Sequence, residues 1–122
     1  MANDFKRFTK PDVGTSTGAS ADAVYTVPAG SGSSALESIV IGITLANKSA
    51  TGITASVFLD NYDGSNDVYI VKDATIPAGA SLEVMSGNKI VVQNNGTTGD
   101  VLRVEASSAT SLDATITVLE DV

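Results

Sequence analysis

The sequence contains no cysteine, no histidine and no tryptophan, and only six of its 122 residues are aromatic. Without cysteine it has no disulfides and no thiolate metal sites. Without histidine as well, the usual general bases and nucleophiles of enzymes are missing, and the spacing of the Ser, Lys and carboxylate residues marks no catalytic site. We therefore expect a protein that is not an enzyme and that needs no cofactor.

Long apolar runs and positive charge are also scarce. No apolar run approaches the ~18 residues that a membrane-spanning helix requires, and the basic N-terminus lacks the apolar segment of a secretory signal. Residues 1–12 carry three basic and two acidic residues, a net +1, whereas the rest carries four basic and twelve acidic residues, a net −8. An acidic body lacks the clustered Lys and Arg that bind phosphates, so we expect neither nucleic acid nor a membrane as partner.

The apolar residues that are present alternate with a period of two. In SIVIGITLAN, residues 38–47, the odd-numbered Ile39, Ile41, Ile43 and Leu45 share one face, which is typical of a β-strand. Comparable stretches lie at 23–27, 53–59, 67–73, 88–93, 100–106 and 112–120. Turn sequences such as DGSN (63–66) and NNGTTG (94–99) separate them.

These patterns predict an all-β chain. With about seven or eight strands, we expect an antiparallel β-sandwich with an immunoglobulin-like or jelly-roll-like Greek key, or otherwise a small barrel. The length suits a single domain. We assign residues 1–20 to an N-terminal arm with a Ser/Thr/Gly-rich link, and residues 21–122 to the sandwich.

The pentapeptide TVPAG at 26–30 recurs as TIPAG at 75–79. Proline ends an extended segment because it cannot donate to a β-ladder, and the following glycine can adopt the left-handed conformation that reverses the chain. We predict two similar corners at which the chain leaves one sheet and enters the other. Chance repetition of a common turn is the alternative, and two copies are too few for a solenoid.

The loop DNYDGSND, residues 60–67, gathers acidic side chains. Asp60, Asp63 and Asp67 offer the oxygen ligands that calcium prefers. Their spacing differs from that of an EF-hand loop, so a structural hairpin loop is the favoured interpretation. We predict no metal site, and these three residues are weak calcium candidates.

The N-terminal segment combines aromatic and basic residues. Phe5 and Phe8 flank Lys6 and Arg7, and Lys10 follows. Two phenylalanines exposed on a frayed terminus would be a liability. We therefore predict that these five residues bind a partner, with the aromatic rings in a groove and the basic groups against acidic surface. The alternative is a segment that folds back as an edge strand over its own core.

Several stretches together carry a resemblance. They are the opening DFKRFTKPDVGTS, then VYTVPAG, IVIGITLAN, YIVKDATIPAGASLEVMSGNKIVVQ and the final SLDATITVLEDV. Across essentially its whole length, the chain resembles small virion structural proteins of tailed bacteriophages, particularly marine phages that infect cyanobacteria. The resemblance implies a non-enzymatic virion component present in many copies, with capsid or tail proteins as partners. It brings no catalytic motif and therefore no site residues.

Together these observations predict a capsid decoration or cement protein. It would form a homo-oligomer and reinforce the phage head through its arm, because many weak contacts on a symmetric shell act together. One alternative is an accessory structural protein of the tail, neck or baseplate. Another is a glycan-binding adhesion module that uses Tyr62 or Tyr69, although the tyrosines form no evident stacking platform.

Overall fold

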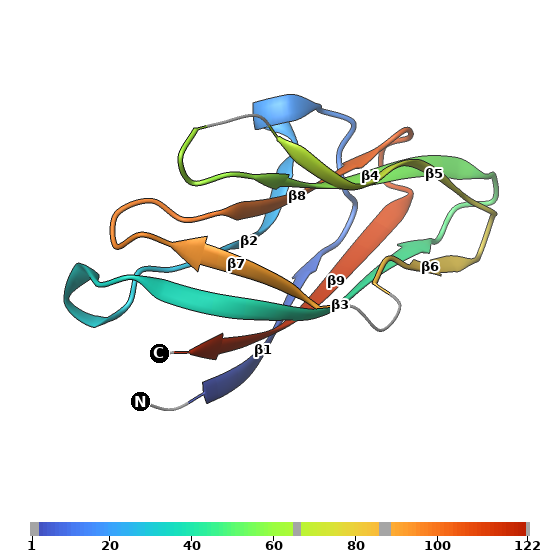
Figure 1. Ribbon diagram of the computed structural model, residues 1–122. Helices are drawn as coiled ribbons and strands as arrows, with labels where there is room; N and C mark the ends of the chain where they lie inside the picture. Colours follow the sequence, from blue (N-terminus) through green and yellow to red (C-terminus); the bar gives the residue numbers. More distant parts are fainter. Residues whose placement is uncertain (1–2, 65–66, 86–88, 122) are drawn as a thin grey trace.

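The alternating segments form strands in two packed antiparallel sheets, as predicted (Figure 1). The computed structural model describes residues 3–64, 67–85 and 89–121. Within these ranges the strands are β1 (Asn3–Lys10), β2 (Asp22–Thr26), β3 (Leu36–Asn47), β4 (Ile53–Asp60), β5 (Val68–Ile76), β6 (Ser81–Glu83), β7 (Ile90–Asn94), β8 (Val101–Ala106) and β9 (Leu112–Asp121). Two 3-10 turns, η1 (Gly18–Ser20) and η2 (Ser31–Ser33), precede β2 and β3. Parts of three sequence predictions lie outside the described residues. They are residues 1–2 of the expected arm, residues 65–66 of the expected turn at 63–66, and residue 88 of the expected strand at 88–93. Residue 122 also lies outside the described residues.

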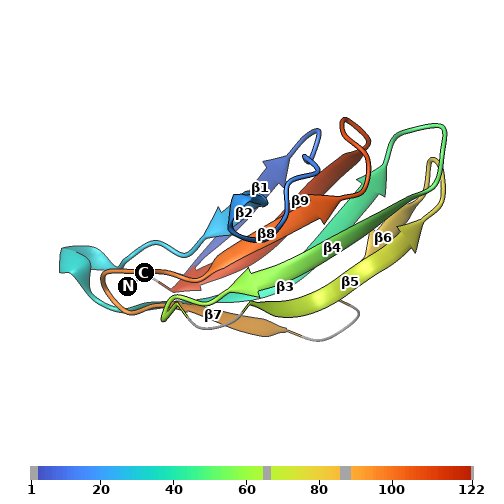
Figure 2. The ribbon, with the colours of Figure 1, turned by 90° about the horizontal axis from the view of Figure 1, so that it is seen from above.

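The strand order distinguishes between the two predicted topologies. One sheet has the order β1-β9-β3, and β6 and β7 both pair with the far edge of β3; the other has the order β2-β8-β4-β5. Figure 2 shows the two layers from above. The first four strands alternate between the sheets, whereas an immunoglobulin fold keeps its first two strands in one sheet. The arrangement is a double-sheet jelly roll, with β6 and β7 sharing one edge position.

The core lies between the two sheets. In one detail, the burial of β3 differs from the prediction for residues 38–47. Ile43 and Leu45 point into the core, as their alternation predicts. Ile39 and Ile41, which were expected on the same face, are only half-buried, and Val40 is fully buried in their place. A β-bulge between Val40 and Gly42 shifts the pairing with β9 by one residue. Such a shift exchanges the two faces of a strand.

Both Pro-Ala-Gly corners cross between sheets, which confirms that prediction. The first joins β2 to β3 and the second joins β5 to β6, each time from the four-stranded to the five-stranded sheet. Gly79 has the expected left-handed backbone, with φ +71. Gly30 does not, because its φ is −74. A Cβ at Gly30 would lie 2.6 Å from Ser34 Oγ and 3.2 Å from the carbonyl oxygen of Ala35, so a side chain there would require these neighbours to shift.

A buried asparagine from the other half of the chain holds each corner. Asn94 Nδ2 donates to the carbonyl oxygen of Val27 at 2.8 Å, and Asn47 Nδ2 donates to that of Ile76 at 3.0 Å. Each asparagine ends a strand of the five-stranded sheet. The Oδ1 atom of each accepts the backbone N–H two positions further along the chain. The two corners are thus fixed in the same way and reciprocally.

The two corners also hold similar places in the fold. β2 and β5, the strands that lead into them, form the two edges of the four-stranded sheet. The segments after the two asparagines, NKSATG (47–52) and NNGTTG (94–99), share Asn and Thr-Gly at equal spacing. The repeated pentapeptide therefore belongs to a longer structural repeat, which disfavours chance repetition.

The N-terminal segment is a strand and not the predicted arm. Residues 3–10 form β1, an edge strand that pairs along its whole length with β9, from Asn3 opposite Asp121 to Lys10 opposite Ala114. The beginning of β1 and the end of β9 consequently lie side by side (Figure 1). The link also packs on the body, because Val13 is fully buried and its N–H donates to the carbonyl of Leu112. The alternative of an edge strand describes this segment, and residue 20 does not separate an arm from the sandwich.

Candidate functional site

β1 divides the five predicted partner-binding residues between its two faces. Lys6 and Phe8 lie opposite residues of β9 that are fully buried, so both side chains face inward. Lys10 follows the same alternation and is half-buried at the end of the strand. Phe5 and Arg7 lie on the opposite, outer face and are exposed.

The inward-facing side chains of β1 are engaged within their own chain. The ring of Phe8 lies 4.6 Å, centroid to centroid, from that of Tyr25. Lys6 Nζ lies 2.8 Å from Oε1 of Glu120, whose side chain is only 1% exposed. Tyr25 OH donates to Glu120 Oε2 at 2.6 Å and also bonds with Ser38 Oγ at 2.8 Å. Lys6 and Phe8 therefore fasten β1 to the core.

This network determines which protonation states are stable. Hydrogen bonding to Glu120, together with its charge, raises the pKa of Lys6 above the ordinary lysine value. Burial raises the pKa of the Tyr25 phenol, and its hydrogen bond to Glu120 adds to that increase. Near neutral pH the Lys6 ammonium thus compensates the buried carboxylate, while Tyr25 remains a neutral donor.

The outer face of the five-stranded sheet carries apolar side chains in one line across four strands. Phe5 of β1 lies opposite Leu119 of β9, which lies opposite Ile39 of β3, which lies opposite Val91 of β7. Phe5 is 75% exposed and Val91 is 56% exposed, whereas Leu119 and Ile39 are half-buried. We call these four residues the outer apolar row. Sequence reasoning singled out Phe5 alone.

Charges of opposite sign flank the outer apolar row. Arg7 lies two positions beyond Phe5 on β1, and Lys89 lies two positions before Val91, next to the start of β7. Because neighbouring strands are antiparallel, these two exposed basic residues fall on the same side of the row. Glu37, exposed on β3 and opposite Gln93, falls on the other side.

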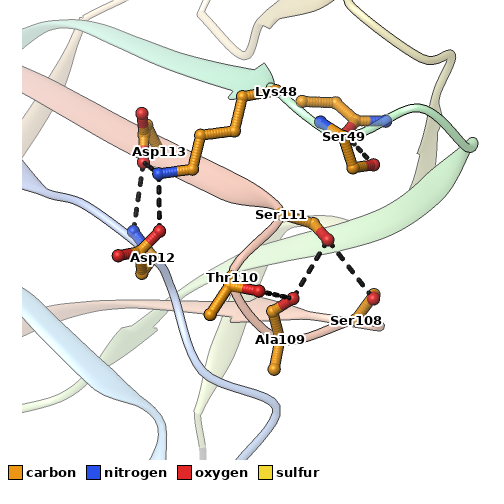
Figure 3. A network of polar contacts seen from close by, with 9 residues as sticks. Asp12, Lys48, Ser49, Ser108, Ala109, Thr110, Ser111 and Asp113 are labelled. Atoms are coloured by element: carbon orange, nitrogen blue, oxygen red, sulfur yellow. Dashed lines mark hydrogen bonds and ion pairs between the residues drawn. The ribbon is translucent and has the colours of Figure 1, made fainter.

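A second polar cluster lies at one end of the sandwich (Figure 3). Lys48 Nζ bridges Asp12 and Asp113, at 2.8 Å from Asp113 Oδ1, and the backbone N–H of Asp12 donates to the same oxygen at 3.0 Å. Hydrogen bonding to Lys48 lowers the pKa of Asp113. All three side chains are exposed, so this cluster connects three surface segments and contributes little to stability.

The three calcium candidates do not form a cluster. Asp60 Oδ2 accepts a hydrogen bond from Arg103 Nε at 2.9 Å, which engages that carboxylate in a salt bridge. Asp63 and Asp67 are exposed. In the part of the chain that the structure describes, no three acidic, histidine or cysteine side chains lie close enough together to hold a metal ion.

A carboxylate that sequence reasoning missed holds the loop after β4. Asp100 is buried, and its two oxygens accept the backbone N–H groups of Tyr62 and Gln93 at 2.8 and 2.9 Å. Its position after the Thr-Gly of the second repeat gives no local signal for this role. The loop after β4 is thereby connected to the end of β7, a contact that only the tertiary structure creates.

The two tyrosines of the glycan-binding alternative have different surroundings. Tyr62 lines a shallow pocket of about 230 Å³ together with Glu37, Gln93, Asn94 and Asn95. Tyr69 packs against Phe58 at 5.1 Å between ring centroids, and Lys72 Nζ lies 4.5 Å above the Tyr69 ring. A pocket of about 200 Å³ elsewhere on the surface is lined mainly by Thr and Ser hydroxyls, with two carboxylates.

Comparison with known proteins leaves the family open. No protein-family model, no curated protein and no solved structure matches this chain. Across the described ranges, no helix has the length and apolarity needed to cross a lipid bilayer.

Proposed function

We propose that this protein is a non-enzymatic structural component of a phage virion, a capsid decoration protein that reinforces the head through protein contacts. The resemblance to phage virion proteins supports the assignment to a virion, and one structural observation supports the decoration role. Phe5 is 75% exposed although β1 is fixed to β9 along its whole length. Aromatic residues are enriched at protein interfaces, where they often dominate the binding energy.

The contact surface is a rigid face and not a flexible tether. Phe5 projects from a paired strand, and the outer apolar row extends the apolar surface across three further strands. A surface that is already ordered loses little conformational entropy when it binds. On a particle with many equivalent positions, a modest contact per subunit is sufficient.

The fold is compatible with this role and with the glycan-binding alternative. Jelly rolls occur in viral capsid proteins and in lectins, so the likeness is an analogy of fold and does not choose between them. In favour of glycan binding, the pocket at Tyr62 combines an aromatic ring with a carboxylate and amides, groups that hydrogen-bond sugar hydroxyls. The tail, neck or baseplate alternative would place the same surface elsewhere on the particle.

The proposal is tested by replacing Phe5 with serine in particles assembled from a genome that carries the substitution. We expect Phe5→Ser to stay folded but to fall at least about tenfold in its amount per particle, the equivalent of about 1.4 kcal/mol of lost binding. Val68→Ser is the matched control, because Val68 is 53% exposed on the other sheet. Normal incorporation of the Phe5→Ser protein would contradict the proposal, and particle images would separate head from tail.

A further inference from the structure

We infer that the outer apolar row binds a second copy of this chain, through two-fold face-to-face packing of the five-stranded sheets. The inference rests on the proposed function, because it assigns a partner to the contact surface described above. It comes from the pattern of charges around the row, which is complementary to itself.

A two-fold axis parallel to the row superimposes apolar on apolar surface. Rotation by 180° about such an axis places the row of one copy on the row of the other, with Phe5 facing Phe5 and Val91 facing Val91. The strands of the two copies then remain roughly aligned. Aligned packing at about 10 Å is a common way for two sheets to meet face to face.

The same rotation pairs opposite charges. It exchanges the two sides of the row, so the side bearing Glu37 in one copy faces the side bearing Arg7 and Lys89 in the other. Each copy carries a net charge of −7, so two copies repel each other at long range. The local pairs oppose this repulsion and determine the orientation of the dimer.

The other face-to-face two-fold is disfavoured by charge. An axis parallel to the strands would place Phe5 over Val91 and leave the row covered. It would also bring Arg7 of one copy over Lys89 of the other, and two like charges at an interface disfavour association. Of the two axes, the one along the row pairs unlike charges on both sides of the row.

The free edge of β1 is a poorer contact for a second copy. Edge strands can extend a sheet into a neighbouring molecule, and charged side chains along the edge discourage this. β1 carries Asp4, Lys6 and Lys10 in addition to Arg7. The outer face of the sheet, with its uncharged outer apolar row, is the more favourable surface for a second copy. Closed two-fold dimers are also the commonest soluble oligomers.

Charge reversal tests the inference on the full-length protein by analytical ultracentrifugation at low salt. We expect a dimer whose dissociation constant rises at least about tenfold in Glu37→Lys and in Lys89→Glu, because each change places like charges together. In the double variant the pair is restored with its signs exchanged. We expect its dissociation constant to return to within about threefold of the wild-type value.

The outcomes separate this inference from the proposed function. A protein that stays monomeric up to about 1 mM, or a double variant no tighter than the single variants, overturns the inference. In that case the proposed function is still decided by the incorporation of Phe5→Ser into particles. A dimer that obeys the charge-reversal pattern, with normal incorporation of Phe5→Ser, upholds the inference and contradicts the proposed function.

Discussion

Tyr25 of one sheet donates a 2.6 Å hydrogen bond to Glu120 of the other, deep between the two layers. The Glu120 side chain is 1% exposed, and its second oxygen meets Lys6 of the N-terminal strand. A buried carboxylate is costly unless it is paired and hydrogen-bonded. This network consequently fastens β1 to the core, although β1 is an edge strand at the beginning of the chain.

Tyr25→Phe tests the hydroxyl at the centre of this network. The substitution keeps the ring against Phe8 but removes the donor to Glu120 and the bond with Ser38. We expect the free energy of unfolding to fall by about 1–2 kcal/mol, measured by urea denaturation. Tyr62→Phe is the matched control and should change it by less than about 0.5 kcal/mol. Equal effects of the two substitutions would contradict the structural role of the Tyr25 hydroxyl.

Stability should depend on alkaline pH. The pKa values of Lys6 and Tyr25 are raised in the folded protein, so their contributions are complete below the unfolded values near 10 and disappear as the pH rises through the folded values. We expect a similar free energy of unfolding at about pH 7 and 9 and a lower one at about pH 11. The free energy of unfolding of the Tyr25→Phe variant should decline less steeply with pH. An equally steep decline would contradict a contribution from the Tyr25 phenol.

The two corner asparagines should be about equally important. Asn47→Ala and Asn94→Ala each remove a buried donor and leave a corner carbonyl without its side-chain partner. We expect each to lower the free energy of unfolding by about 2–3 kcal/mol. Asn95→Ala, next in the chain but exposed, is the control and should cost less than about 1 kcal/mol. A large difference between the effects of Asn47→Ala and Asn94→Ala would contradict the equal importance of the two asparagines.

The similar segments 47–52 and 94–99 supply a matched pair of glycines. A Cβ on Gly99 would lie 2.1 Å from the carbonyl oxygen of Val27, whereas a Cβ on the equivalent Gly52 would lie 3.8 Å from that of Ile76. Gly99→Ala should therefore destabilise by about 1–3 kcal/mol or more through overpacking. Gly52→Ala should be nearly neutral. Thermal melting of both variants checks this, and an equal loss in the two would contradict the packing at Val27.

Deletion of residues 1–12 should compromise the fold itself. It removes the pairing of β1 with β9, the ring contact of Phe8 and the ammonium that compensates Glu120. We expect the truncated chain to melt at a clearly lower temperature or to be unfolded, as judged by circular dichroism. A truncated protein as stable as the full chain would show that the segment is a dispensable arm.

Local pattern predicted the strands and corners that depend on neighbouring residues. Alternation located seven of the strands, and the Pro-Ala-Gly sequence marked two of the crossings between sheets, those from β2 to β3 and from β5 to β6. The segment 3–10 was predicted as an edge strand only in the alternative interpretation, because its apolar residues, Phe5 and Phe8, do not alternate. β6 is only three residues long and offers too little pattern. The bulge in β3 was equally invisible, since it arises from pairing with β9.

The residues of the candidate site also divide into those identified from the sequence and those found only in the structure. Phe5 and Arg7 were identified from composition, and they are the two of the five candidates that face outward and are exposed. Leu119, Ile39 and Val91 were not, because each resembles an ordinary strand residue in its own segment.

By itself, the amino-acid sequence determined that this chain would form strands and where it would turn, because both follow from residues close together along the chain. Its composition alone made the body acidic. Only the tertiary structure decided that the N-terminal segment would form the edge strand of the five-stranded sheet. It also decided that four side chains distant in sequence would lie in one row across that sheet. Register between strands far apart in the chain sets both results, and no local segment encodes that register.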